Sequence, residues 1–199
     1  GGFGMRIAFI GFGEAARAFV SSLREHDGLS FSAFDVLTIR GGDEDLRRAA
    51  ATLDVQVAPT AAAAVEGADW VFSAVTAADS LDAGFSVKGL LSDGQVFVDI
   101  NSVSAGRKVE TACIVCGNGA AYVDMAVMAP VYPRLHRTRV LLAGPACAGL
   151  ADTFHALGFD FSIVGEEIGA ATSIKMLRSL FVKGMEAVTV QTLLAAKAA

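Results

Sequence analysis

The feature that most constrains this chain is the change from an apolar run to a glycine turn near its beginning. The apolar segment that starts at Met5 stops at Gly11, turns through Gly13 and continues as a segment of helical pattern. This order points a helix N-terminus, with its unpaired N–H groups and positive dipole end, at whatever lies beyond the strand, and a diphosphate is the usual occupant. Gly11 allows the tight turn, Gly13 lets the backbone approach a pyrophosphate, and Ala16 lets the helix lie close to the strand. The turn predicts a dinucleotide site; the alternative is a tight strand–helix turn without a ligand.

Short apolar runs separated by helical segments predict the fold class. We expect helices over residues 14–24, 45–53 and 61–66, and a further helix from Ser104. After the first strand, the expected strands are residues 36–39, 55–57, 70–75, 96–100, 122–127, 139–143 and 159–164. Continuous apolar strands that alternate with helices indicate a mostly parallel sheet covered on both faces. The sequence therefore predicts an α/β, Rossmann-type doubly wound domain over residues 5–166.

The last 30 or so residues have a different pattern. Residues 170–198 carry apolar side chains at helical spacing without a proline, which predicts one helix far longer than the average of a globular domain. A helix this long and apolar needs a partner for its surface. We expect residues 167–199 to begin a truncated all-α second domain, and two copies to associate as a homodimer through this C-terminal helix.

Composition excludes several classes of protein. With 53% hydrophobic residues and a mean hydropathy of +0.51, the chain can bury a sizeable core, yet no stretch reaches the ~20 apolar residues of a membrane span. The net charge of −5 and the dispersed basic residues argue against a nucleic-acid partner. We therefore expect a small-molecule substrate as the partner and contact with neither membrane nor nucleic acid.

Cysteine and histidine usage points away from metal chemistry. Three cysteines are an odd number in a chain with no evident signal sequence, which favours the reducing cytoplasm. Cys113 and Cys116 have metal or redox spacing but lack a second ligand pair, so we expect buried small side chains and no metal site. His26, His136 and His155 share no metal-like spacing and are expected on the surface or as local caps.

The residue that follows the second strand distinguishes two dinucleotides. An acidic residue there bonds the ribose 2′-OH of NAD, whereas an arginine pairs with the 2′-phosphate of NADP. The expected strand over residues 36–39 is followed by Arg40, and no carboxylate stands at its end. Asp43 and Glu44 come after two glycines and suit the start of the next helix. The sequence therefore predicts NADP, with contacts from Arg40, and leaves NAD as the alternative.

Four segments occur in an order that matches a known family. These are GFGEAA (11–16), DINS (99–102), YVDMAV (122–127) and VGEEIGAATSIK (164–175). They resemble, in turn, the cofactor loop, the loop after the fifth strand, the strand before the substrate loop and the entry to the interdomain helix of the β-hydroxyacid dehydrogenase superfamily, which includes 6-phosphogluconate and 3-hydroxyisobutyrate dehydrogenases. The resemblance implies a nicotinamide coenzyme held by the cofactor loop, the end of the fourth strand and the loop after the fifth: Gly11, Phe12, Gly13, Glu14, Ala15, Val75, Thr76 and Asn101.

The same resemblance implies hydride transfer between nicotinamide and a small hydroxy acid-like substrate, with Lys175 as the catalytic acid and base. Lys175 lies in an otherwise apolar turn, where burial and the nearby helix N-terminus are expected to lower its pKa; the alternative is a lysine that reaches solvent. Ser102 is expected to contact substrate. The alternative role for Ser102 or Ser104 is the N-cap of the following helix.

Two positions depart from the family pattern. Met128-Ala129-Pro130 replaces the usual Ser-Gly-Gly, and Ser179 replaces an Asn one turn after the lysine. Met128 and Ser179 are expected at the substrate site, but both changes remove polar groups that would hold a carboxylate or hydroxyl. An imine reductase, or a coenzyme-binding module without activity, therefore remains an alternative. The basic loop over residues 134–139 either recognises an anionic substrate or is solvated.

Overall fold

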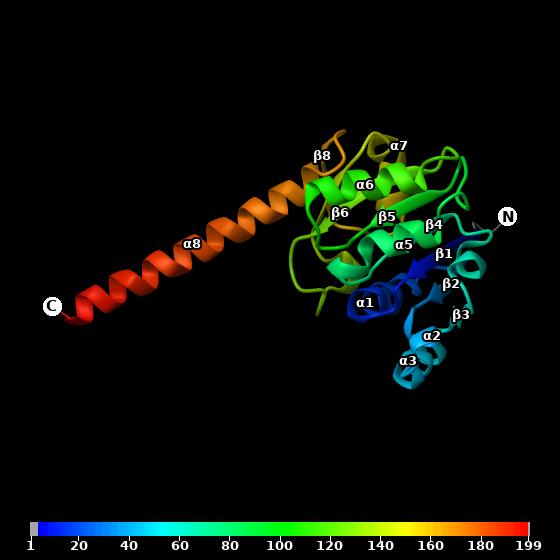
Figure 1. The fold of residues 1–199 in the computed structure, drawn as a ribbon, viewed down its shortest axis with the longest axis horizontal. Coiled ribbons are helices and arrows are strands. Elements are labelled where there is room, and N and C mark those ends of the chain that lie inside the picture. Colours follow the sequence, from blue (N-terminus) through cyan, green and yellow to red (C-terminus); the bar gives the residue numbers. More distant parts are fainter. Residues whose placement is uncertain (1–3, 199) are drawn as a thin grey trace.

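An eight-stranded sheet forms the centre of the computed structural model, which describes residues 4–198 (Figure 1). The strand order is β3-β2-β1-β4-β5-β6-β7-β8, and all neighbours pair in parallel except β6 and β7. The strands are β1 (Met5–Ile10), β2 (Leu29–Phe34), β3 (Val55–Val57), β4 (Trp70–Ser73), β5 (Val96–Asp99), β6 (Ala121–Val127), β7 (Val140–Ala143) and β8 (Phe161–Gly165). The predicted Rossmann-type, mostly parallel sheet is confirmed.

Helices cover both faces of this sheet. The helices of the described residues are α1 (Glu14–Leu23), α2 (Leu37–Arg40), α3 (Glu44–Leu53), α4 (Ala61–Val65), α5 (Ser80–Ser86), α6 (Ala105–Val115), α7 (Cys147–Ala156) and α8 (Ala170–Ala198), with 3-10 turns η1 (Ala77–Asp79) and η2 (Leu135–Arg137). Alternate residues of β1 enter two separate cores. Phe9 packs on the face covered by α1, α3 and α7, whereas Ala8 and Ile10 pack on the face covered by α4, α5 and α6.

The second strand lies earlier in the chain than the sequence predicted. β2 pairs with β1 from Leu29 to Phe34, whereas residues 36–39, the expected strand, fall in the turn that becomes the one-turn helix α2. Ile39 is 72% exposed, so its apolar side chain does not belong to a buried strand. β2 was missed because serines interrupt its apolar pattern. Ser32 is nevertheless buried, since its hydroxyl donates a 2.7 Å hydrogen bond to the Ala64 carbonyl.

The long C-terminal helix is confirmed as α8, with 29 residues. It leaves the sheet beside β8 and projects away from the rest of the molecule (Figure 1). Only Ala171 and Thr172, in its first turn, are buried. Large apolar side chains farther along, such as Phe181, are exposed. Residue 199 lies outside the described residues, and the division into domains at residues 166 and 167 stays a prediction. Within residues 4–198, no helix has both the length and the apolarity to cross a membrane.

Candidate active site

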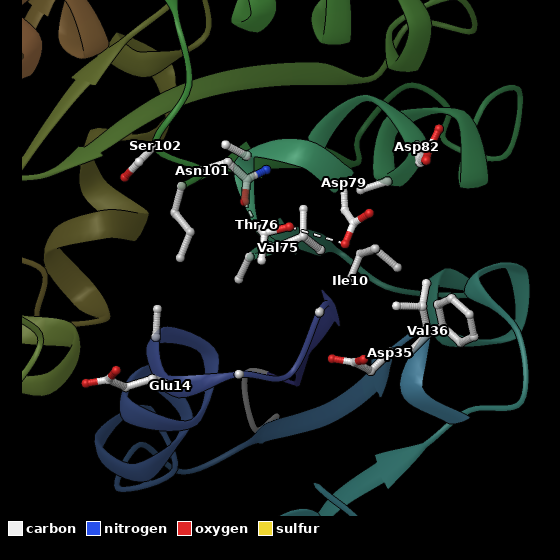
Figure 2. A pocket seen from close by; sticks show the side chains of 18 of the residues that line it. Ile10, Glu14, Asp35, Val36, Val75, Thr76, Asp79, Asp82, Asn101 and Ser102 are labelled. Atoms are coloured by element: carbon white, nitrogen blue, oxygen red, sulfur yellow. Dashed lines mark hydrogen bonds between the residues drawn. The ribbon is translucent and has the colours of Figure 1, made fainter. Parts of the chain in front are cut away.

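A pocket of about 740 Å³ lies where β1, β2, β4 and β5 end. Its wall comes from the ends of these strands and the segments that follow them, which include parts of α1, α2 and α5. Val127 at the end of β6, Val131 and Lys175 of α8 complete it. Side chains converge on it from the α1, β2, β4 and β5 segments (Figure 2). The neighbouring strands β1 and β4 continue into connections on opposite faces of the sheet, and ligands of open α/β sheets bind at this kind of switch point. The volume suits a small-molecule ligand.

The glycine turn leaves the α1 N-terminus open toward the pocket. Gly11 has a φ of +90°, and a Cβ there would lie 2.2 Å from the Ala74 carbonyl oxygen. A Cβ on Gly13, which lines the pocket, would meet no protein atom within 4 Å. No side chain of the described residues caps the first turn of α1. Its N–H groups are therefore available to an anion, and Gly13, Glu14 and Ala15 line the space in front of them.

Phe12 lies behind the pocket wall. Its side chain is fully buried in the core, and it is absent from the pocket wall. Its backbone N–H donates to Oδ2 of Asp35 at 2.9 Å, so this N–H is already bonded. The other oxygen of Asp35 accepts the N–H of Leu37 at 3.0 Å. Asp35 therefore joins the glycine turn to the start of α2.

Asp35 overturns the premise of the coenzyme argument made from the sequence. It is the first residue after β2, so a carboxylate does stand at the end of the second strand. Asp35 is hard to recognise from the sequence because the apolar run that suggests a strand, residues 36–39, begins after it, whereas β2 ends before it. Asp35 and Arg40 both line the pocket, and Arg40 is exposed there at the end of α2.

Asn101 holds the wall of the pocket through hydrogen bonds. Its side chain is 4% exposed; its Oδ1 accepts the N–H of Val75 at 2.7 Å, and its Nδ2 donates to Ser73 Oγ at 2.9 Å. Both ends of the amide are thus engaged in joining the loop after β5 to the loop after β4. Thr76 lies in the same wall and donates to Asp79 at 3.2 Å (Figure 2). Asn101, Val75 and Thr76 all line the pocket, and the hydrogen bonds of Asn101 fix its shape.

Lys175 and Ser102 meet at the other end of the pocket. Nζ of Lys175 donates to Ser102 Oγ at 3.2 Å. The N-cap of α6 is Ser104, whose Oγ accepts the N–H of Arg107, so Ser102 is left to face the lysine. The expected lowering of the Lys175 pKa is confirmed. Burial is its main cause, and the second is the positive charge of Lys108, which the sequence analysis did not consider.

The two family departures lie outside the pocket wall. Met128 is half-buried, and its carbonyl accepts a 3.3 Å hydrogen bond from Arg178 on α8. Ser179 is exposed, one turn beyond Lys175. Neither residue lines the pocket formed by the described residues, so their expected substrate contacts are not found in this arrangement. Val127 and Val131 line it instead, which makes this end of the pocket apolar.

The basic loop is engaged in internal pairing. Arg134 and Arg139 both pair with Asp160, at 3.3 and 2.9 Å, and Arg137 pairs with Glu25 at 3.0 Å. The loop therefore offers the pocket none of these cations. His136, expected on the surface, is fully buried between Ser22 and Leu157. His136 is therefore neither a surface residue nor a local cap, the two roles expected of it, because its hydrogen-bond partners lie 114 and 21 residues away along the chain.

The cysteines are only partly as expected. Cys147 is buried, and burial raises the pKa of its thiol to about 11. Cys113 is exposed and Cys116 half-buried, so neither is a core side chain. Residues 4–198 contain no group of three or more His, Cys, Asp or Glu side chains arranged to hold a metal ion.

Beneath the pocket lies a buried ionic cluster that the sequence analysis also missed. It consists of Asp99, Lys108, Tyr122 and Asp124, all buried. A signal was present: two carboxylates in otherwise apolar strands require a buried cation, and Lys108 precedes Ala112 and Val115 on the inner face of its helix.

Comparison with known proteins finds relatives of similar sequence and fold. The family model described as NADP oxidoreductase, coenzyme F420-dependent, matches residues 6–102. A conserved hypothetical protein from Sinorhizobium meliloti 1021 is similar at 35% identity and a TM-score of 0.88; the match covers 98% of this chain and 65% of that one. The conserved protein MTH1747, whose structure is described as similar to 3-hydroxyacid dehydrogenases, is 27% identical with a TM-score of 0.80, and the match covers 96% of this chain and 70% of that one.

An imine reductase from Myxococcus stipitatus, a variant solved in complex with NAD+, is 25% identical with a TM-score of 0.73. The match covers 95% of this chain and 63% of the reductase. The chain thus spans between 63% and 70% of the length of these three proteins.

Proposed function

From the premise that this chain belongs to the β-hydroxyacid dehydrogenase superfamily and matches its coenzyme-binding part, we propose that it is an NAD(P)-dependent oxidoreductase that uses Lys175 to transfer the proton. One observation carries the proposal. A single pocket joins the uncapped N-terminus of α1, where a diphosphate fits, to half-buried Lys175 and its exposed partner Ser102. Binding and chemistry therefore share one continuous site.

The described residues fit a dinucleotide. The first turn of α1 offers free N–H groups and its positive dipole end, and the open space at Gly13 admits a pyrophosphate close to the backbone. Asp35 and Arg40 lie beyond β2, at the position that reads the adenosine ribose in this class of fold. When bound, the nicotinamide coenzyme supplies or accepts a hydride.

Lys175 provides the proton step. In the direction of reduction, its ammonium group protonates the developing alkoxide or amine, and in oxidation its neutral amine accepts that proton. Burial and the charge of Lys108 lower its pKa, which brings the protonated and neutral forms closer in energy at neutral pH. Ser102 accepts a hydrogen bond from Nζ and so holds it toward the pocket.

Replacement of Lys175 tests this role. We expect K175M to lower kcat by about 10²-fold or more while the dissociation constant for NADPH, measured by fluorescence titration, changes little. K183M is the matched control, because Lys183 is exposed two turns farther along the same helix. Activity should be assayed with short hydroxy acids, their oxo forms and cyclic imines. Full activity of K175M on hydroxy acids would refute the proton-transfer role.

A second candidate function is imine reduction. The likeness to the Myxococcus imine reductase favours it, as does the apolar wall contributed by Val127 and Val131 near Lys175. An imine reductase depends less on proton transfer from Lys175, so turnover of cyclic imines by K175M would favour imine reduction. Coenzyme binding without turnover of any substrate in the panel would instead favour a binding module without activity.

NADP is the coenzyme that we propose. The sequence favoured it because no carboxylate was expected after the second strand; with Asp35 at that place, the proposal rests instead on the hydrogen bonds of Asp35 and the charge of Arg40. Both carboxylate oxygens of Asp35 already accept backbone N–H groups, whereas the exposed guanidinium of Arg40 has no ion-pair partner among the described residues. Arg40 can therefore pair with a 2′-phosphate. We expect R40A to weaken NADPH binding by about tenfold and leave NADH binding within twofold. D35N, which removes the carboxylate charge beside the same ribose, is the complementary variant. An unchanged preference in R40A contradicts this assignment.

A further inference from the structure

Lys108 lies at the centre of the buried ionic cluster defined above. Its Nζ is 3.2 Å from Asp99 Oδ1 and 3.3 Å from Asp124 Oδ1, and it donates a 2.6 Å hydrogen bond to the Asp99 carbonyl. Both carboxylates and the ammonium are fully buried. The lysine, which comes from α6, thus bridges the last residue of β5 and the middle of the neighbouring strand β6.

Asp124 connects this cluster to the helix that bears Lys175. Its Oδ2 accepts the N–H groups of Gly169 at 3.0 Å and Thr172 at 3.2 Å. These N–H groups belong to the beginning of α8, where an unpaired donor and the positive dipole end favour a carboxylate. A strand residue 45 positions away along the chain therefore caps the catalytic helix.

Asp99 connects the same cluster to the loop that bears Ser102. Its Oδ1, which faces Lys108, also accepts the backbone N–H of Asn101 at 2.9 Å. Asn101 precedes Ser102, and Ser102 accepts the hydrogen bond of Lys175. A closed path of polar contacts and short chain segments thus runs from Lys175 through α8, Asp124, Lys108, Asp99 and the Ser102 loop back to Lys175.

The junction between α8 and α6 is also too tight for a side chain at position 169. Gly169 has a φ of +100°, and a Cβ on it would lie 2.8 Å from the Cβ of Ala105, the first residue of α6. The start of α8 therefore packs directly against the start of α6, three residues before Lys108. A bulkier residue at position 169 would push α8 away from this junction.

Stability alone is a weak reason for such a cluster. Desolvation of buried ions cancels much of their attraction, and apolar replacements are often as stable. Charged groups do, however, impose directions and distances that an apolar contact leaves free. Here the hydrogen bonds of the cluster fix the start of α8 and the Ser102 loop, the two elements that meet at the Lys175 ammonium.

We propose that Lys108 and Asp124 are positioning residues, which fix the first turn of α8 against the Ser102 loop and so hold the Lys175 ammonium in the pocket. The inference rests on the proposed function, since it concerns the geometry of the same proton donor.

The protonation behaviour of Lys175 reports on this geometry. Burial is the main cause of its lowered pKa, so loosening the first turn of α8 admits water and raises that pKa. The positive charge of Lys108, on α6, is the second cause of the lowered pKa of Lys175. The remaining charged residues that line the pocket are Glu14, Asp35, Arg40, Asp79 and Asp82, and the variants below leave all of them unchanged.

The test compares D124N with Y122F. The Tyr122 hydroxyl donates to the other oxygen of Asp99 at 2.7 Å, so Y122F removes a hydrogen bond from the same cluster without touching α8. We expect D124N to lower kcat about tenfold, leave the NADPH dissociation constant within twofold, and move the Lys175 limb of the kcat–pH profile to higher pH. Y122F should move neither kcat nor the limb. If Asp124 only stabilised the fold, D124N would lower the fraction of folded protein without moving the Lys175 limb of the kcat–pH profile.

Two further measurements test the proposal even if D124N does not fold or the catalytic role of Lys175 is wrong. G169A displaces α8 without altering any charge, and it should move the limb in the same direction even if D124N fails to fold. The pKa of Lys175 is also measured directly, by NMR of the reductively methylated protein, with the resonance assigned through K175R. A rise of that pKa in D124N and G169A supports positioning even if K175M proves active and the catalytic proposal fails. An unchanged pKa and limb in both variants would overturn it.

Discussion

Stability at mildly acidic pH is expected to depend on His136. Its Nε2 donates to the Leu157 carbonyl at 2.6 Å, and its Nδ1 accepts the hydroxyl of Ser22 at 2.5 Å. This arrangement requires the neutral imidazole with the proton on Nε2. Burial is the main reason why the pKa of His136 falls from 6.5 to about 4. Between pH 6.5 and about 4, His136 therefore stays neutral in the folded protein but is protonated in the unfolded chain.

The size of the effect follows from that difference. Above pH 6.5 neither state is protonated at His136, and its contribution to the free energy of unfolding is complete. Between pH 6.5 and about 4 only the unfolded chain binds the proton, so stability declines as the pH falls. The total loss is roughly 3 kcal/mol, at up to about 1.4 kcal/mol per pH unit. Below pH 4 this contribution no longer changes.

Urea unfolding between pH 8 and 4 measures this loss. We expect the free energy of unfolding of the wild type to fall more steeply than that of H136Q, and the two curves to converge toward pH 4. H155Q is the control, because His155 is exposed on α7 and its removal also costs one imidazole. The difference between wild type and H136Q isolates His136 from the carboxylates that titrate in the same range. Parallel curves for wild type and H136Q would refute the reasoning.

Three further predictions concern the glycine turn and α8. G11A should lower the free energy of unfolding by about 2 kcal/mol or more in a urea titration, because its Cβ overlaps the Ala74 carbonyl at a positive φ; an unchanged midpoint contradicts this. G13V should leave the free energy of unfolding within about 0.5 kcal/mol of the wild-type value and weaken NADPH binding at least tenfold, because its side chain enters open pocket space; equal affinity would show that the coenzyme lies elsewhere. Exposed apolar residues on α8 predict concentration-dependent self-association in sedimentation velocity, which F181E should weaken; a monomer at every concentration removes the dimer prediction.

Much of the fold could be predicted because its signals are local. The turn at Gly11 and Gly13 lies between a strand and a helix, and continuous apolar runs mark β4, β5 and β6. The same local pattern misplaced β2, because a buried serine looks polar in the sequence. Ser32 is satisfied by the Ala64 carbonyl, 32 residues away, and no local rule reveals such a partner.

The candidate site divides in the same way. The glycine turn could be selected from residue type and order alone, because it lies between a strand and a helix of clear pattern. Lys175 and Ser102 were selected through the resemblance to a known family, since the local pattern fits a solvent-reaching lysine and a helix-capping serine equally well. Their meeting in one pocket depends on the parallel order of the strands, which brings loops far apart in the chain to one edge of the sheet. The exposed position of Ser179, outside the pocket, is likewise set by the direction of α8.

The sequence by itself determined the elements, the glycine turn and the kind of chemistry that a lysine in an apolar helix turn can perform. Only the tertiary structure decided which charges meet. Asp35 stands beside the turn because β2 pairs with β1, and Asp124 caps α8 because the start of α8 packs against β6. The reason is physical: helix and strand preferences act over a few residues, whereas hydrogen bonds and ion pairs form between any groups that folding brings within about 3 Å.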